Sequence, residues 1–215
     1  MVNATRPERL LDVDARAHLV EAVRSAERRT QGEIVLMVVR ACDEYGSAGW
    51  RLGVALAVAA FCGLHAFAQP LPWWFYLLAQ LAGLLLGHGL ARLDPLRRGL
   101  LGPRLAEERV HERARRAFLE NGLTRTHGRT GILIFVALLE RRVVVLADEG
   151  IHSALDPNER WEQVVALAVE GLRRGQALQG LEAAIHRCGE ILVHHFPVSP
   201  ERNTDELPNA VVIED

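Results

Sequence analysis

The chain contains no lysine, because all 25 of its basic residues are arginines. A lysine Schiff base needs the neutral lysine amine and a P-loop nucleotide site needs the lysine ammonium, so both are excluded. Cysteine is scarce as well: the chain has three, Cys42, Cys62 and Cys188, widely separated in sequence. An odd number of scattered cysteines is typical of free thiols in a reducing compartment rather than of a disulfide framework.

The chain also lacks an excess of charge of either sign. It has 25 basic and 27 acidic residues, for a formal net charge of −2. Nucleic-acid binding draws most of its affinity from basic side chains that neutralise phosphates, so we expect no nucleic-acid partner. The length of 215 residues suits one domain, or one domain with a small appendage.

Charge is absent altogether from one internal block. The forty residues between Arg51 and Arg92 include no Asp, Glu or Arg, and Pro70 and Pro72 divide them. The halves, 52–68 and 73–91, are each long enough to cross the hydrocarbon layer of a membrane as a helix. We predict a transmembrane helical hairpin over 51–92. The alternative, a helical hairpin buried in a soluble core, is less favoured because a small domain cannot cover so much apolar surface.

Arginines flank this block on both sides, whereas the turn within it carries no charge. The flanking residues are Arg40, Arg51, Arg92, Arg97, Arg98 and Arg104. By the positive-inside rule, we expect a two-pass protein of the cell inner membrane with both termini in the cytoplasm and lipid as a partner. The internal position of the block argues against a cleavable signal peptide.

Alternating helix and strand patterns surround the block. Helical spacing of apolar residues, with the usual start and stop signals, predicts helices over 14–30, 105–120, 158–174 and 178–195. Apolar β-branched runs predict strands over 34–39, 132–138 and 143–147, the last two forming a β-hairpin around 140–142. Strand 34–39 is apolar at every position, which is typical of a central strand covered on both faces.

These elements predict an α/β fold, with a small central mixed sheet flanked by helices in an α/β/α arrangement. Neither flank of the hairpin can build a sheet alone, so we expect one discontinuous domain over 1–50 and 93–198. The hairpin is then an insertion within that domain. The remaining segment, 199–215, is polar and contains two prolines, and it is predicted to be a disordered tail apart from 210–213.

Short motifs in a fixed order resemble those of the TPM-domain family. The matching stretches are Glu27-x-x-Thr30-x-Gly32-Glu33-Ile34, Arg129-Thr130-Gly131, Leu139-Glu140-Arg141, Asp148-x-Gly150-Ile151, Trp161 and Gly180-Leu181. The resemblance covers roughly residues 10–195 without the hairpin, and the chain looks like a short bacterial form with a membrane hairpin inside the domain.

The resemblance implies a central sheet flanked by helices and two different kinds of function. The family includes thylakoid-lumen proteins tied to photosystem II repair, one of them described as an acid phosphatase, and an accessory subunit of nematode acetylcholine receptors. Many bacterial members look like accessory membrane proteins associated with LemA-type proteins. The exported members carry a signal peptide and an anchor after the domain, and we expect this chain to depart from that arrangement, because its apolar block lies inside the domain.

Carboxylates lie at the predicted ends of strands, where ligands often bind in open sheets. Glu33 begins the first strand, and Asp148 and Glu149 follow the third. With Arg129 they form a candidate ligand or cation site, for which Ca²⁺ or Mg²⁺ would be the natural ions. The alternative is structural: the carboxylates cap backbone groups or pair with Arg129 and Arg141.

Other chemistry finds less support. Histidine and glutamate recur every four residues on one face of the last helix, at His186, Glu190 and His194, a weak candidate for zinc that lacks a fourth ligand. The spacings of cysteine, histidine and aspartyl phosphatases are absent, so a phosphatase would need metal-activated water. The sequence therefore favours a non-catalytic accessory or partner-binding module with a cytoplasmic TPM domain. A metal-dependent acid phosphatase acting on phosphate esters is the alternative.

Overall fold

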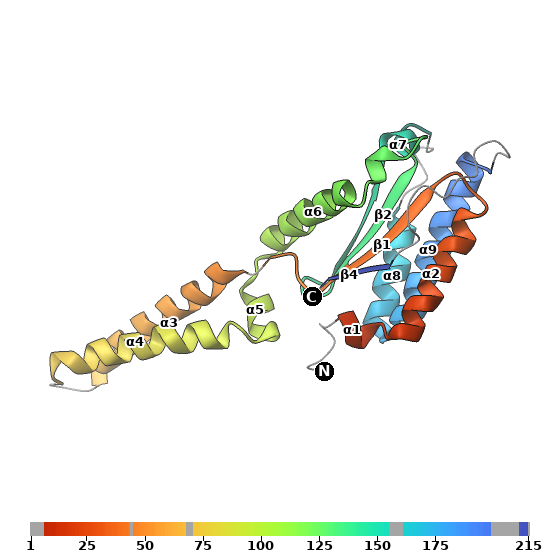
Figure 1. The fold of residues 1–215 in the computed structure, drawn as a ribbon. Helices are drawn as coiled ribbons and strands as arrows, with labels where there is room; N and C mark the ends of the chain where they lie inside the picture. The colour runs from red at the N-terminus through yellow and green to blue at the C-terminus, as the bar shows by residue number, and fades with distance from the viewer. Residues whose placement is uncertain (1–6, 44, 68–70, 155–160, 199–210, 215) are drawn as a thin grey trace. The chain divides into compact units, whose positions relative to one another are not determined.

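The computed structural model describes residues 7–43, 45–67, 71–154, 161–198 and 211–214 (Figure 1). The chain divides into two compact units. One is built around a sheet and combines 1–42 with 107–215, and the other is helical and comprises 43–106. We call them the sheet unit and the hairpin unit and describe each by itself.

Within the described residues, the sheet unit has four strands, in the order β3-β2-β1-β4. They are β1 (Glu33–Val39), β2 (Gly131–Ala137), β3 (Arg142–Ala147) and β4 (Val211–Glu214). Strand β1 pairs in parallel with β2 on one side and with β4 on the other, and β2 pairs antiparallel with β3. The predicted mixed sheet and its β2–β3 hairpin are therefore confirmed.

Helices cover both faces of this sheet (Figure 1). Residues at even positions of β1 and β2 face a cluster with α2 (Val13–Glu27), α8 (Glu162–Arg174) and α9 (Ala177–His195). Residues at odd positions face the opposite cluster with α6 (Pro103–Glu120). All seven residues of β1 and all seven of β2 are buried, as expected of central strands between two layers of helices.

Three short helical segments complete the sheet unit. They are α1 (Pro7–Leu10), the 3₁₀ turn η1 (Leu123–Arg125) and α7 (Glu149–Ala154). The sequence patterns do not predict these segments, because each is too short to show a helical period.

Two sequence-based boundaries need correction. Strand β4 extends the sheet to four strands, because Val211 and Ile213 pack against one core cluster and Val212 against the other. The first predicted helix ends at Glu27 rather than at residue 30, because Thr30 forms a β-bridge with Pro197. Positions 158–160 of the predicted helix 158–174, and 199–210 of the predicted tail, lie outside the described residues.

The hairpin unit consists of α3 (Gly46–Phe67), α4 (Trp73–Leu90) and the short α5 (Asp94–Leu100). Glycines allow α3 and α4 to approach closely along their length. A Cβ atom added to Gly87 would lie 2.3 Å from the Cα of Gly53, and one added to Gly83 would lie 2.8 Å from the nitrogen of Ala57. The two helices therefore run antiparallel with their backbones almost in contact.

Both helices are long and apolar enough to cross a membrane. At 1.5 Å per residue, α3 spans about 33 Å and α4 about 27 Å, close to the thickness of the hydrocarbon layer. Little of either candidate span, Gly49–Ala66 or Trp73–Leu90, is buried against the protein. Their exposed large apolar side chains are Trp50, Val54, Val58, Phe61, Trp73, Trp74, Phe75, Leu77, Leu78, Leu81, Leu85 and Leu86.

The buried thiol of Cys188 predicts that the sheet unit loses stability at alkaline pH. Burial of Cys188 in α9 raises the pKa of its thiol, and the nearby charge of Glu27 raises it further. In the unfolded chain the thiol ionises near pH 8.5. Above that pH the unfolded chain releases a proton that the folded chain retains, so stability falls as pH rises.

We expect the free energy of unfolding to fall by about 1 kcal/mol between pH 8 and pH 9.5, and Cys188→Ala to remove this dependence. Urea unfolding of the full chain in detergent measures it, with Trp161 as the fluorescent reporter after the other tryptophans are changed to phenylalanine. Equal pH dependence with and without Cys188 would contradict the prediction.

Candidate functional site

The candidate site residues lie at the end of the sheet where β1 and β2 begin. Glu33 pairs with Gly131 in the β1–β2 ladder, and the Asp148 N–H donates to the Gly131 carbonyl at 2.9 Å. Glu33, Gly131 and Asp148 therefore form one row across three strands. Residues two apart on a strand face the same side of the sheet. Val35, Leu133 and Leu146 lie two residues from Glu33, Gly131 and Asp148, and they belong to the core cluster with α6, so all three residues of the row lie on the α6 face.

Strand β2 lies between the two carboxylate residues of this row. Two interstrand spacings separate Glu33 from Asp148, which is roughly 10 Å between Cα atoms. The space above Gly131 is filled by η1, because a Cβ atom at Gly131 would lie 2.6 Å from the Leu123 carbonyl oxygen and 2.9 Å from its Cδ2. The structure thus brings Asp148, Glu149 and Arg129 together, and it leaves Glu33 on β1, two strands away, with Leu123 over the intervening Gly131.

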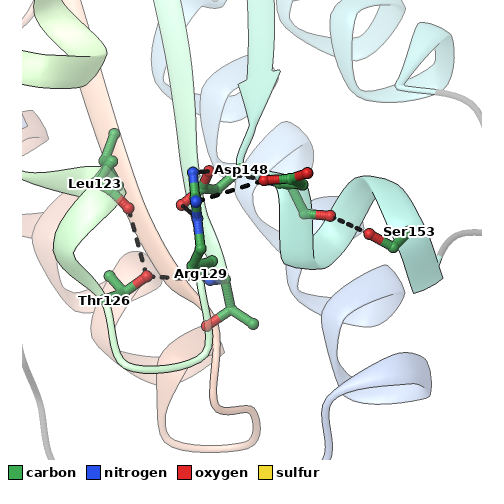
Figure 2. A network of polar contacts seen from close by, with 7 residues as sticks. Leu123, Thr126, Arg129, Asp148 and Ser153 are labelled. Carbon is green, nitrogen blue, oxygen red and sulfur yellow. Dashed lines mark hydrogen bonds and ion pairs between the residues drawn. The ribbon is translucent and has the colours of Figure 1, made fainter.

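Asp148 is a buried carboxylate whose oxygens accept several hydrogen bonds (Figure 2). The Arg129 guanidinium donates to both oxygens, with Nη2–Oδ1 at 3.0 Å and Nε–Oδ2 at 3.3 Å. The backbone N–H of Glu149 donates to Oδ1 at 2.8 Å. The Asp148 carbonyl accepts from the N–H groups of Ile151 and His152, so the residue also begins α7. Asp148 joins the end of β3 to the first turn of that helix.

Arg129 sits on a strained but well-supported loop. Its φ of 51° lies in the left-handed region, which costs a residue with a Cβ atom of order 1 kcal/mol or more. The Thr126 hydroxyl donates to the Leu123 carbonyl and accepts from the Thr130 N–H, and the Arg129 N–H donates to the Thr126 carbonyl (Figure 2). These bonds hold the loop so that the guanidinium faces Asp148.

The charges of the site favour the pairing. The hydrogen bonds and the charge of Asp148 raise the pKa of Arg129, and Glu149 adds a smaller contribution through an Nη1–Oε2 contact at 3.4 Å. The Arg129 side chain is 53% exposed and that of Asp148 is 5% exposed. Solvent therefore reaches the guanidinium and Glu149, whereas the carboxylate of Asp148 is enclosed.

Several buried or half-buried polar residues that carry the family resemblance contact backbone groups at the two ends of the sheet. Thr30 donates to the Phe196 carbonyl and Thr130 to the Gln31 carbonyl. Glu27 accepts from the Ile34 N–H at 2.7 Å, and Glu140 accepts from the Cys42 N–H at 2.9 Å. The motifs alone assign these residues no role. The contacts of Thr30, Thr130 and Glu140 join segments distant in sequence, which no local pattern reveals.

The zinc candidate lies on an exposed face of α9. His186, Glu190 and His194 are all exposed, and Glu190 pairs with Arg187 at 2.9 Å. Within the described ranges, no three histidine, cysteine, aspartate or glutamate side chains are placed to hold one metal ion. A cation at Asp148 would share its oxygens with the guanidinium of Arg129.

Comparison with known proteins supports the assignment of the domain. Residues 100–191 match the family model of the TPM domain, which confirms the resemblance over that part of the chain. The solution structure of the BA42 protein from the psychrophilic bacterium Bizionia argentinensis is similar to this chain, with a TM-score of 0.57 and 19% identity over 94% of each chain. At that identity the similarity concerns the fold alone. No curated protein matches the chain significantly.

Asp148 allows a test of whether this network is structural. Asp148→Ala removes the acceptor for the Glu149 N–H, and we expect the free energy of unfolding to fall by about 1–2 kcal/mol, as when a helix cap is lost. Glu149→Ala is the matched control, because its exposed ion pair contributes less than about 0.5 kcal/mol. Urea unfolding followed through Trp161 measures both variants. A gain of stability in Asp148→Ala would instead indicate a functional carboxylate held under strain.

Proposed function

We propose that this chain is a two-pass protein of the inner membrane. Its sheet unit, which holds most of the TPM-domain match over residues 100–191, faces the cytoplasm in this proposal. In this proposal the sheet unit is a non-catalytic accessory module that binds a partner within a membrane complex. The resemblance stated above makes a LemA-type membrane protein the first partner to test.

The observation that carries the proposal is the outer surface of α3 and α4. These helices pack on each other through glycine and alanine, and they turn large apolar side chains outward from Trp50 to Phe61 and from Trp73 to Leu86 of the candidate spans. Exposure of this extent is very costly in water but suits lipid chains. A core helix of a soluble protein would have this surface covered.

Charge supports the orientation. Six arginines flank the end of the hairpin unit at which α3 begins and α4 finishes. Residues 68–76, which connect the two helices and begin α4, carry no charge. Arginine-rich flanks stay in the cytoplasm. Both flanks lead into the sheet unit, so the whole unit would lie on that side.

The contacts of the candidate site support a non-catalytic role. Asp148 already accepts from Arg129 and from a backbone N–H, and Leu123 lies over Gly131, the residue between Asp148 and Glu33 in the row. The buried threonines and Glu140 hold backbone groups at the sheet ends. The family motif residues thus provide hydrogen-bond partners for buried backbone groups, a role that requires no reacting centre.

A metal-dependent acid phosphatase is the second candidate, and one observation favours it. Glu33 and Asp148 are buried carboxylates in the same row and on the same face of the sheet. Displacement of Leu123 would open the space between them, where Ca²⁺ or Mg²⁺ would find oxygen ligands.

Cysteine labelling tests the membrane topology. In a chain with Cys42, Cys62 and Cys188 replaced, Pro72→Cys places a thiol at the turn between α3 and α4, and Arg116→Cys places one on exposed α6. We expect a membrane-impermeant maleimide to label the first in intact cells and the second only after lysis. Labelling of both in intact cells, or extraction of the chain by alkaline carbonate, would contradict the topology.

A hydrolysis assay distinguishes the two functions. We expect the purified full chain to hydrolyse p-nitrophenyl phosphate no faster than a blank, with or without Mg²⁺ or Ca²⁺. Hydrolysis by the wild-type chain that is lost in both Glu33→Ala and Asp148→Asn, but kept in the control Glu170→Ala at an exposed position of α8, would establish the phosphatase and overturn the non-catalytic role.

A further inference from the structure

The two ends of the hairpin unit differ sharply in charge. At the end where α3 begins and α4 finishes, residues 92–104 contain four arginines and one acid, Asp94. At the other end, residues 68–76 contain neither acid nor arginine. Arg92, Arg98 and Arg104 are exposed at the charged end.

Exposed apolar residues lie among these arginines. Leu93 and Leu96 are 52% and 41% exposed, and Trp50, in the first turns of α3, is 58% exposed. On the helical period, Leu93, Leu96 and Leu100 share one side of α5 and Arg98 lies on the opposite side. A short helix with one leucine side and a basic opposite side is suited to lie in the plane of a membrane surface.

Contacts at the start of α3 fix α5 in place. The Arg97 guanidinium donates to the Asp43 carbonyl at 3.1 Å and lies over the Tyr45 ring, 5.4 Å from its centroid. Tyr45 is buried and has a φ of 48°, so the chain turns sharply where it enters α3. The Trp50 ring packs against His88 near the end of α4, with 5.5 Å between ring centroids. Trp50 and α5 therefore belong to the same end of the hairpin unit.

We propose that this end of the hairpin unit binds the headgroups of anionic phospholipids. The binding surface, which we call the basic belt, consists of Trp50, Arg92, Leu93, Leu96, Arg98 and Arg104. Its arginines pair with headgroup phosphates, and its leucines and tryptophan enter the layer just below them. The proposal rests on the membrane insertion argued above, and it adds the lipid class and the residues that select it.

A bilayer fits the belt better than a free anion does. A free phosphate would need only the arginines, and it would leave Leu93, Leu96 and Trp50 in water. The belt is also continuous with the exposed apolar surface of α3 and α4, so a lipid that covers those helices necessarily brings its headgroup to this level.

Tryptophan quenching by brominated lipids tests the proposal on the full chain reconstituted in bilayers. Phenylalanine replaces all tryptophans but one, which leaves either Trp50 at the belt or Trp74, 46% exposed, at the uncharged end. The measured quantity is the ratio of quenching by brominated phosphatidylglycerol to quenching by brominated phosphatidylcholine. We expect a ratio of about 5 at Trp50, the contribution of roughly one arginine at an anionic surface, and a ratio near 1 at Trp74.

The triple variant Arg92→Gln/Arg98→Gln/Arg104→Gln should lower the ratio at Trp50 to below about 2 and leave Trp74 unchanged. Arg97 is kept because it holds the turn. Equal ratios at Trp50 and Trp74, or no effect of the triple variant, would overturn the proposal. Inorganic phosphate that abolishes the preference at matched ionic strength would also overturn it, by identifying a free-anion site. Absence of quenching at both tryptophans by either lipid would contradict membrane insertion itself.

Discussion

The structure depends on the parallel pairing of β1 with β2 across the hairpin unit. Glu33–Val39 and Gly131–Ala137 meet in unbroken register although nearly a hundred residues separate them along the chain. Both strands are buried on both faces, so their backbone groups have only each other and their outer neighbours as hydrogen-bond partners. Neither flank of the hairpin unit can satisfy these groups without the other, and the sheet unit must form from both.

This constraint explains the polar residues at the ends of the sheet. A parallel pair leaves backbone donors and acceptors where each strand enters and leaves the core. Glu27 and the threonines satisfy them at the start of β1, and Glu140 does so where the chain leaves β1 for α3. Between β3 and α7, the Asp148 carboxylate accepts a hydrogen bond from the Glu149 N–H, and the Arg129 guanidinium forms an ion pair with it. The acids and the arginine of the candidate site therefore also hold the end of β3 to the first turn of α7.

Two kinds of apolar surface occur in one chain and meet different requirements. The sheet unit hides its apolar residues between helices in two layers. The hairpin unit uses glycines to bring α3 and α4 together and leaves leucine and tryptophan outward. The first arrangement minimises contact with water, and the second is suited to lipid chains. The arginines of the basic belt lie where the second surface ends, which is where a bilayer changes from apolar to charged.

The sequence by itself determined the elements whose signals are local. Apolar runs predicted three of the four strands within one residue at each end, and the charge-free block predicted α3 and α4 because no soluble surface is so uniformly apolar. The family motifs located Asp148 and Arg129, but they did not distinguish a carboxylate that binds a ligand from one that caps backbone groups. Only the tertiary structure decided that Leu123 lies over Gly131, and that Val211–Glu214 adds a fourth strand. Both features depend on contacts between segments far apart in the chain, and side-chain periodicity carries no record of such contacts.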